Sequence, residues 1–270
     1  MTWRVHADPV MLVAGIRALL FQALHPLAMA GVAQFSDYRT APWSRLHRTA
    51  EFVAKTTFGP ADEAVALGAR VRQLHGGMSG IDRETGRAYR VSDPELLRWV
   101  HVCEAESFLS TYRRAGGYLE PGEADRYYDE MQIAADLVGC PEVPRSEAAV
   151  EAYLRSMRPQ LRATKDARAA ARFIVNPPMP RWVALGTPAK PAWWAVGALA
   201  VSLLPRWARR MYALPGLPTT DLGATVSLRL LRRALYVVPP EVREGPALRE
   251  ARIRLSAIGP SGMTGPLLGV

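Results

Sequence analysis

Apolar residues recur along this chain at spacings of three and four, and almost no stretch alternates between apolar and polar positions. That periodicity predicts amphipathic α-helices, and two of them begin with a capping residue followed by proline, Asp8-Pro9 and Asp93-Pro94. The helices we expect span residues 9–33 (kinked at Pro26), 42–58, 60–76, 93–115, 121–138, 146–162, 164–175, 189–213 (broken near Pro205), 220–237 and 240–256. The pattern therefore predicts an all-α protein.

One segment departs from helical periodicity. Residues 80–91 place β-forming residues on both sides of Gly86, which predicts a small β-hairpin. The chain has no internal repeat and no low-complexity segment, and its 270 residues are enough to bury one core. We therefore expect residues 1–270 to form a single helical domain, a multi-helix bundle.

Composition narrows the class of protein further. With 49% hydrophobic and 22% charged residues, the chain is typical of a globular protein rather than of a disordered or integral membrane protein. Cys103 and Cys140 are the only cysteines, and their spacing matches neither a disulfide framework nor a zinc site. Asp8 and Pro9 interrupt the start of the chain before its apolar stretch, so it lacks a cleavable signal pattern. We expect a cytoplasmic protein.

Charge is divided unevenly along the chain. Residues 1–149 hold 16 Lys and Arg against 19 Asp and Glu, a formal charge of −3, whereas residues 150–270 hold 18 against 6, a charge of +12. A basic C-terminal half is typical of proteins that meet an anionic partner, either phospholipid headgroups or nucleic acid. A solvated arginine-rich surface explains the imbalance equally well.

The run 192–204 is uncharged and mostly apolar, but it is shorter than the ~20 residues that cross a bilayer as a helix. Four tryptophans and three arginines surround or follow it: Trp182, Trp193, Trp194, Trp207, Arg206, Arg209 and Arg210. A helix that lies at a membrane interface has this mixture of residues, and the three arginines would then face anionic lipid. A buried core helix is the alternative.

A cluster of polar residues is expected on the helix 42–58. Arg45, Arg48 and Thr49 stand at positions i, i+3 and i+4, so they share one face, whereas His47 lies about 200° around the helix from Arg45. Two cations and a hydroxyl group therefore point the same way, and His47 is assigned to solvent or to a structural contact. The competing interpretation of the arginines is a salt-bridged surface.

His75 closes the next helix, with Val71 at i−4 and Gly68 at i−7 on the same stripe. A glycine inside a helix costs roughly 1 kcal/mol relative to alanine, so Gly68 indicates the close approach of a bulky flat group or of another helix. Both explanations stay open.

Two further histidines are candidates for chemistry. His101 has Glu104 at i+3, which could orient or charge-pair the imidazole, as in a site or as in an ordinary core pair. His25 precedes Pro26, where its ring could satisfy carbonyl groups that the proline leaves without a partner. A structural role for His25 is equally plausible.

An ordered set of short motifs runs through the first hundred residues: Ala23-Leu24-His25-Pro26, Gly31-Val32-Ala33, Pro42-Trp43-Ser44-Arg45-Leu46-His47-Arg48-Thr49, Phe58-Gly59, Arg70-Val71-Arg72-Gln73-Leu74-His75, Gly80, Tyr89 and Asp93-Pro94-Glu95-Leu96-Leu97-Arg98-Trp99-Val100-His101. This set resembles a bacterial domain-of-unknown-function family related to rubber oxygenase (latex clearing protein). The superfamily includes the fungal membrane-bound oxygenase that cleaves the farnesyl chain in mycophenolic acid biosynthesis. The resemblance covers about residues 10–235.

The resemblance implies an all-helical fold that holds a b-type haem and uses dioxygen to cleave or oxidise an isoprenoid or other hydrophobic substrate. It implies that His75 is the iron ligand on one side of the haem and that Arg45 and Thr49 flank the iron on the other side. The stripe of His75 would then place Gly68 and Val71 beside the cofactor. Rubber oxygenases have a lysine directly before this threonine, where the present chain has Arg48. No CxxCH motif is present, so the haem would be held without a covalent bond.

Three functions follow from these observations. We favour a haem-b-dependent oxygenase that acts with dioxygen on a small hydrophobic substrate, in which Arg45 or Arg48 stabilises developing negative charge and His25 and His101 shuttle protons or support the site. The second is a protein that binds haem or lipid without turnover. The third is a basic adaptor at an anionic membrane surface, and we expect no nucleic-acid partner. The sequence does not set the oligomeric state.

Overall fold

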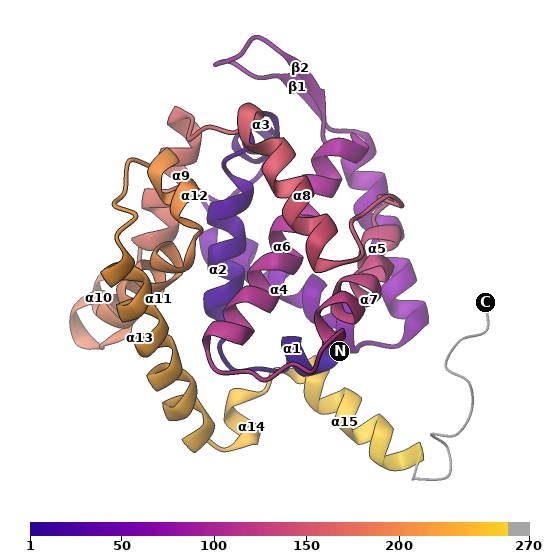
Figure 1. The fold of residues 1–270 in the computed structure, drawn as a ribbon, viewed down its shortest axis with the longest axis vertical. Helices are drawn as coiled ribbons and strands as arrows, with labels where there is room; N and C mark the ends of the chain where they lie inside the picture. Colours follow the sequence, from indigo (N-terminus) through magenta and orange to yellow (C-terminus); the bar gives the residue numbers. More distant parts are fainter. Residues whose placement is uncertain (259–270) are drawn as a thin grey trace.

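The structure is a computed structural model that describes residues 1–258, and it confirms the all-α class (Figure 1). The first half contains α1 (Thr2–His6), α2 (Met11–Gln22), α3 (Pro26–Phe35), α4 (Pro42–Phe58), α5 (Ala61–Gly76), β1 (Ser79–Ile81), β2 (Ala88–Arg90), α6 (Pro94–Arg114) and α7 (Glu123–Leu137). The second half contains α8 (Glu147–Met157), the 3₁₀ helix η1 (Arg158–Gln160), α9 (Lys165–Val175), α10 (Arg181–Gly186), α11 (Ala189–Leu203), α12 (Arg206–Met211), α13 (Pro218–Val237), α14 (Pro240–Arg243) and α15 (Pro246–Ile258).

Helices α2 and α6 form the centre of the molecule and pack along each other (Figure 1). Phe21 of α2 and Trp99 of α6 are fully buried, and their rings meet edge to face with centroids 5.5 Å apart. The indole Nε1 of Trp99 donates a hydrogen bond of 2.9 Å to the carbonyl of Gln22. The buried indole thus packs its apolar surface and also has a partner for its N–H group, so it stabilises the contact between α2 and α6. The other helices are arranged around this pair.

The chain bends by 108° between α2 and α3. The sequence predicted one helix over 9–33 with a kink at Pro26, and that prediction is wrong because the helix ends and a new one begins. The backbone of His25 is extended (φ −84°, ψ 117°), as expected for a residue before proline. Its Nδ1 accepts a hydrogen bond of 3.4 Å from the N–H group of Ala28. His25 thus caps the start of α3 instead of satisfying carbonyl groups.

The predicted hairpin is confirmed. Strands β1 and β2 pair antiparallel, with Ser79 opposite Arg90 and Ile81 opposite Ala88. Gly86 adopts a positive φ of 69° in the turn, a conformation that favours glycine. The hairpin packs on α3, because the ring of Tyr89 is buried in one cluster with Leu27 of that helix. This packing holds the segment that follows His75 against the helix that follows His25.

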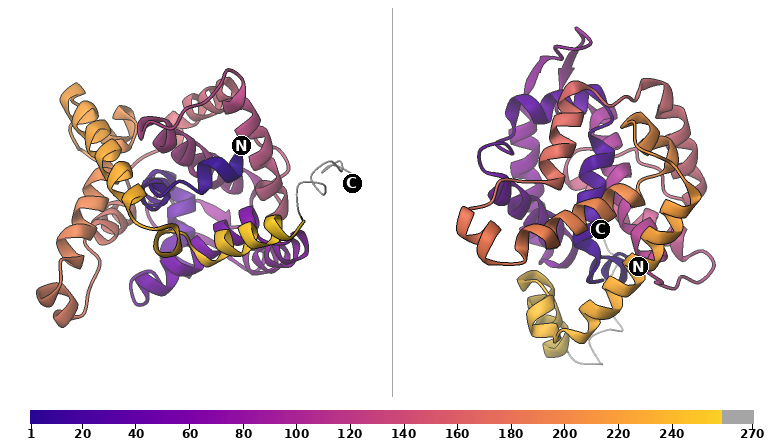
Figure 2. Two further views of the ribbon diagram at one scale, coloured as in Figure 1. Left: turned by 90° about the horizontal axis from the view of Figure 1, so that it is seen from below. Right: turned by 90° about the vertical axis from the view of Figure 1, so that its left-hand side faces the viewer.

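Helices α9 to α13 lie on one side of the core (Figure 1 and Figure 2). The predicted break near Pro205 is confirmed, since α11 ends at Leu203 and α12 begins at Arg206. Helix α15 lies against α4 from below, where Leu248 and Phe58 share a small cluster. Helices α1 and α10 were not predicted, since their 5 and 6 residues are too few to show a period. The single helix predicted over 240–256 is wrong in one respect, because the chain breaks after Arg243 and forms α14 and α15.

Within residues 1–258, no single helix has the length and apolar composition needed to cross a membrane. Helices α2 and α3 pass that test only when they are taken together, across their 108° bend.

Candidate functional site

The candidate site lies on α4 and α5, which pack against each other and carry Arg45, Thr49 and His75. Proline residues begin this unit in the sequence: Pro42 is the first residue of α4, and Pro60 precedes α5. The positive end of α5 is met by Asp62 and Glu63 in its first turn, which stabilises the start of the helix that ends with His75.

Arg45 and Thr49 contact each other, as their spacing predicted. A guanidinium nitrogen of Arg45 donates to the hydroxyl of Thr49, and the Thr49 hydroxyl donates to the carbonyl of Arg45 over 3.0 Å. The Nε of Arg45 donates over 3.1 Å to the hydroxyl of Ser36, which lies in the loop before α4. Burial of Arg45, followed by repulsion from Arg48, lowers the pKa of its guanidinium group. Among residues 1–258 no carboxylate pairs with this half-buried cation.

Arg48 does not join this pair, so the prediction of three convergent side chains is wrong for Arg48. Its guanidinium group lies 2.7 Å from both carboxylate oxygens of Asp37, and 55% of its side chain is exposed. The i+3 offset places Arg48 at the edge of the Arg45 face, within reach of the loop that carries Asp37. His47 is exposed, which confirms that it faces away from Arg45.

His75 is half-buried at the end of α5, one turn after the half-buried Val71. Its Nδ1 is buried and has no hydrogen-bond partner in the described part of the chain. Burial lowers the pKa of His75 below 6.5, and the positive charge of Arg45 lowers it further. The imidazole is therefore neutral at pH 7 and has an uncommitted nitrogen, the state in which histidine binds a metal ion.

Gly68 lies at the crossing of α5 with α7. A Cβ atom built on Gly68 would lie 2.9 Å from the Cβ of Leu137 and closer still to the Leu137 carbonyl oxygen. Arg72, one turn later, donates to that same carbonyl. The close approach of another helix therefore explains this glycine, and the contact with a flat cofactor that we assigned to Gly68 and Val71 stays a prediction.

His101 and Glu104 lie one turn apart on α6, but neither a hydrogen bond nor an ion pair joins them in the structure of residues 1–258. Burial lowers the pKa of His101 to about 4 and raises the pKa of Glu104 to about 7. The expected charge pair is wrong because burial favours the uncharged form of each group. At neutral pH, His101 is therefore uncharged, and Glu104 holds a proton far more readily than an exposed glutamate does.

His25 is buried and differs from His75 in its bonding. Burial lowers its pKa to about 4, with Arg87 lowering it further and Asp93 opposing the shift. Since its Nδ1 already accepts from Ala28, only Nε2 is left for the predicted proton-shuttle or supporting role.

A half-buried histidine network at the base of α4 was not predicted from the sequence. The Nδ1 of His6 lies 3.0 Å from the hydroxyl of Thr57, and its Nε2 lies 3.2 Å from the hydroxyl of Tyr127. Burial lowers the pKa of His6 to about 3, so the ring stays neutral. This network ties α1, α4 and α7 together, and no local signal could have revealed it because its partners lie 51 and 121 residues away.

Two of the three arginines after the apolar run, Arg206 and Arg209, form ion pairs within the fold. Arg209 is 1% exposed, and its guanidinium group lies 2.5 Å from the carboxylate of Asp221, which Arg206 also contacts at 2.5 Å. The prediction that Arg209 faces lipid is therefore wrong, because its side chain is buried. Arg206 is paired with Asp221 but stays 49% exposed, and the guanidinium group of Arg210 is exposed without a partner in the described residues. Within the run, Gly197, Ala200 and Leu203 are buried.

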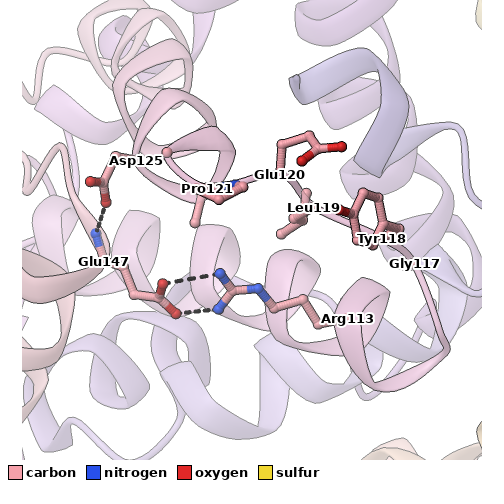
Figure 3. A pocket seen from close by; sticks show the side chains of 10 residues that line it. Arg113, Gly117, Tyr118, Leu119, Glu120, Pro121, Asp125 and Glu147 are labelled. Atoms are coloured by element: carbon pink, nitrogen blue, oxygen red, sulfur yellow. Dashed lines mark hydrogen bonds and ion pairs between the residues drawn. The ribbon is translucent and has the colours of Figure 1, made fainter.

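A surface hollow of about 590 Å³ lies where α6 ends and α7 begins (Figure 3). Three of its four charged groups are engaged, since Arg113 forms an ion pair with Glu147 and the Glu147 N–H group donates over 2.8 Å to Asp125. None of the candidate site residues lines this hollow.

The residues described also contain no group of three or more His, Cys, Asp or Glu side chains that could hold a bare metal ion. Cys103 and Cys140 are buried free thiols.

The family described as "ER-bound oxygenase mpaB/B′/Rubber oxygenase, catalytic domain" matches residues 3–237, which is most of the chain. The chain belongs to this family. No curated protein and no solved structure matches it. The oxygenase catalytic domain thus includes α1 to α13 together with Arg45, Thr49 and His75, and the match ends at Val237, so α14 and α15 follow the matched region.

Proposed function

We propose that this member of the oxygenase family is a haem-b-dependent oxygenase that uses dioxygen to oxidise or cleave a small hydrophobic, isoprenoid-like substrate. The observation that carries the proposal is the state of His75. Its neutral imidazole has a buried nitrogen without a partner, next to the half-buried cation Arg45. Five buried side-chain atoms lack a partner in the described residues, and this one is the only histidine nitrogen among them. A buried polar atom without a partner costs free energy, so its presence indicates that a ligand satisfies it.

The residues present fit a non-covalently held haem. A single imidazole is sufficient to ligate haem iron, so the lack of a larger cluster of ligands in residues 1–258 agrees with this cofactor. His75 would hold the iron, and Arg45, Thr49 and Val71 would lie around the group. When bound, haem would supply the capacity to bind and reduce dioxygen.

The protein groups then have distinct roles. Arg45 keeps its positive charge in a half-buried setting, and Thr49 and Ser36 fix the direction of its guanidinium group. Fixed donors in a low-dielectric site stabilise negative charge that develops during a reaction, so we assign this role to Arg45 with Thr49. Arg48 has no such role, since Asp37 neutralises it. His101, neutral at pH 7, is assigned to proton transfer or support, together with His25 through Nε2.

Oxygen uptake by the haem-loaded protein tests this proposal. Farnesol and a saturated alcohol of equal length are compared as substrates, with the protein at known haem content. We expect oxygen consumption that depends on farnesol and yields a shortened or oxygenated product. Stoichiometric haem without substrate-dependent oxygen uptake across a set of isoprenoids would instead indicate a binding protein.

A further inference from the structure

One side of the C-terminal half exposes large apolar side chains that the core does not use. We define the α10–α13 face by six such residues on α10, α11 and α13: Trp182, Leu185, Trp194, Leu222, Val226 and Leu230. Leu185 is 87% exposed and Trp182 is 74% exposed. Helix α11 packs on both α10 and α13, so the three helices are contiguous, and Figure 2 shows them on the same side of the molecule.

Helix α13 shows that this exposure follows a pattern. Leu222, Val226 and Leu230 are four residues apart, so they form one stripe along the solvent side of the helix. The opposite side is also apolar, and its Ala224 and Leu228 are buried against the protein. A surface helix normally has polar residues on its solvent side. The outward stripe of α13 is covered by nothing in residues 1–258, and it therefore indicates a further contact.

The charges around this face are almost all positive. The sequence contains no Asp or Glu from residue 167 to residue 220, a stretch that spans α10, α11 and α12. Arg181, Lys190 and Arg233 are exposed, and none of them has a carboxylate partner in the described part of the chain. Asp221, the acidic residue of α13, is engaged by Arg206 and Arg209. The face is therefore complementary to an anionic surface.

We propose that the α10–α13 face docks onto an anionic phospholipid bilayer. Exposed tryptophan and leucine side chains partition into the boundary between headgroups and acyl chains, and Arg181, Lys190 and Arg233 meet the lipid phosphates. A second copy of the chain is a poorer occupant, because a symmetric contact would bring like charges together. The proposal depends on residues outside α4 and α5 and does not require the oxygenase activity.

Cosedimentation of the full-length protein with vesicles tests the charge component. Vesicles of pure phosphatidylcholine are compared with vesicles that also contain phosphatidylglycerol. The variant R181Q/R233Q removes two charges from the face, and R83Q/R90Q removes two exposed arginines from the hairpin region as a matched control. Each basic residue near an anionic surface contributes about fivefold to partitioning, so R181Q/R233Q should weaken binding roughly 25-fold. The control should bind as the unmodified chain does.

The apolar component is tested in 1 M salt, where the Debye length falls to about 3 Å and the attraction between charges is screened. The attachment that survives 1 M salt should be lost in W182S/L185S, whose circular dichroism should match that of the unmodified chain because both side chains are exposed. Equal binding to neutral and anionic vesicles, or no binding to either, would overturn the proposal. Equal losses in R181Q/R233Q and R83Q/R90Q would also overturn it, as would a salt-stable dimer that forms through this face in place of vesicle binding.

Discussion

Arg45 is half-buried and Arg209 is buried, but the two guanidinium groups have different partners. This difference distinguishes the N-terminal half of the molecule from the C-terminal half. Arg209 is bonded to the carboxylate of Asp221 and to the carbonyl of Ser202. Arg45 has only hydroxyl partners and lies near a histidine nitrogen that has no partner. The C-terminal half has the larger excess of charge, but its buried Arg209 is held by a carboxylate, although its Nε has no partner. The half-buried cation without a carboxylate partner and the histidine nitrogen without a partner lie together in the N-terminal half. The candidate site is therefore located by this pair of groups, and not by a count of charges.

The largest effect is expected at His75. His75→Ala should abolish stoichiometric haem binding while helical content stays largely intact, because a ligand on a helix face contributes to the cofactor more than to the fold. Haem content per chain and far-ultraviolet circular dichroism measure the two quantities. His47→Ala is the matched control, since His47 is exposed and should retain full haem. Loss of haem in both variants would remove the distinction between the two histidines.

In the C-terminal half the expected effect is on stability. Arg209→Ala removes the buried partner of Asp221 and should lower the free energy of unfolding by about 3 kcal/mol, the low end for broken buried pairs because Arg206 still contacts Asp221. Arg210→Ala alters the exposed neighbour and should change stability by less than about 0.5 kcal/mol. Urea unfolding of the two variants measures both values. Equal stabilities would mean that Arg209 is no more committed to the fold than Arg210.

The third prediction concerns turnover. Arg45→Ala and Thr49→Ala should keep haem but lower the rate of substrate oxidation, by roughly 100-fold for Arg45, as for the loss of one preorganised donor. Arg48→Ala should have little effect, because Arg48 is exposed and paired with Asp37. Rates per bound haem give the comparison. If Arg48→Ala were as slow as Arg45→Ala, the orientation of the two side chains in the structure would be contradicted.

The sequence predicted those features that depend on neighbours along the chain. The helical class, the hairpin around Gly86 and the contact of Arg45 with Thr49 all follow from local spacing. The features it missed depend on distant partners. Asp37 draws Arg48 away from the site, and Asp221 engages Arg209 from another helix. No periodicity reports which carboxylate a cation will meet after folding.

Gly68 and His25 show a second limit. A glycine inside a helix or a histidine before a proline indicates a local constraint, but the groups that pack against that residue in the fold decide its role. Leu137 of α7 explains Gly68, and the extended backbone before Pro26 turns His25 into a helix cap. A crossing helix and a flat cofactor both favour glycine at such a position, so the sequence alone does not distinguish them.

The fourth prediction uses two half-buried groups on α6, His101 and Glu104, whose pKa values move in opposite directions. His101 is neutral in the folded chain down to pH about 4, while the unfolded chain takes up a proton below 6.5, so its contribution to stability is lost as pH falls. Glu104 keeps its proton in the folded chain up to pH about 7, against 4.5 when unfolded, so its contribution is lost as pH rises.

Between pH 7 and pH 5 each of these groups should therefore change the free energy of unfolding by about 2 kcal/mol, with opposite signs. Relative to the unmodified chain, His101→Gln should become more stable on acidification and Glu104→Gln less stable. Urea unfolding at the two pH values measures the slopes. Slopes of the same sign in both variants would show that the two groups do not titrate as burial requires.

Titration of haem into the purified chain tests the central claim most directly. If His75 holds a b-type haem, the absorption spectrum should show a Soret band typical of an imidazole-bound haem that saturates at one equivalent, and His75→Ala should lose it. Added imidazole should restore the band in that variant, because free imidazole can take the place of the missing side chain. Saturable binding that is unchanged in His75→Ala, or no saturable binding by the unmodified chain, would contradict the account.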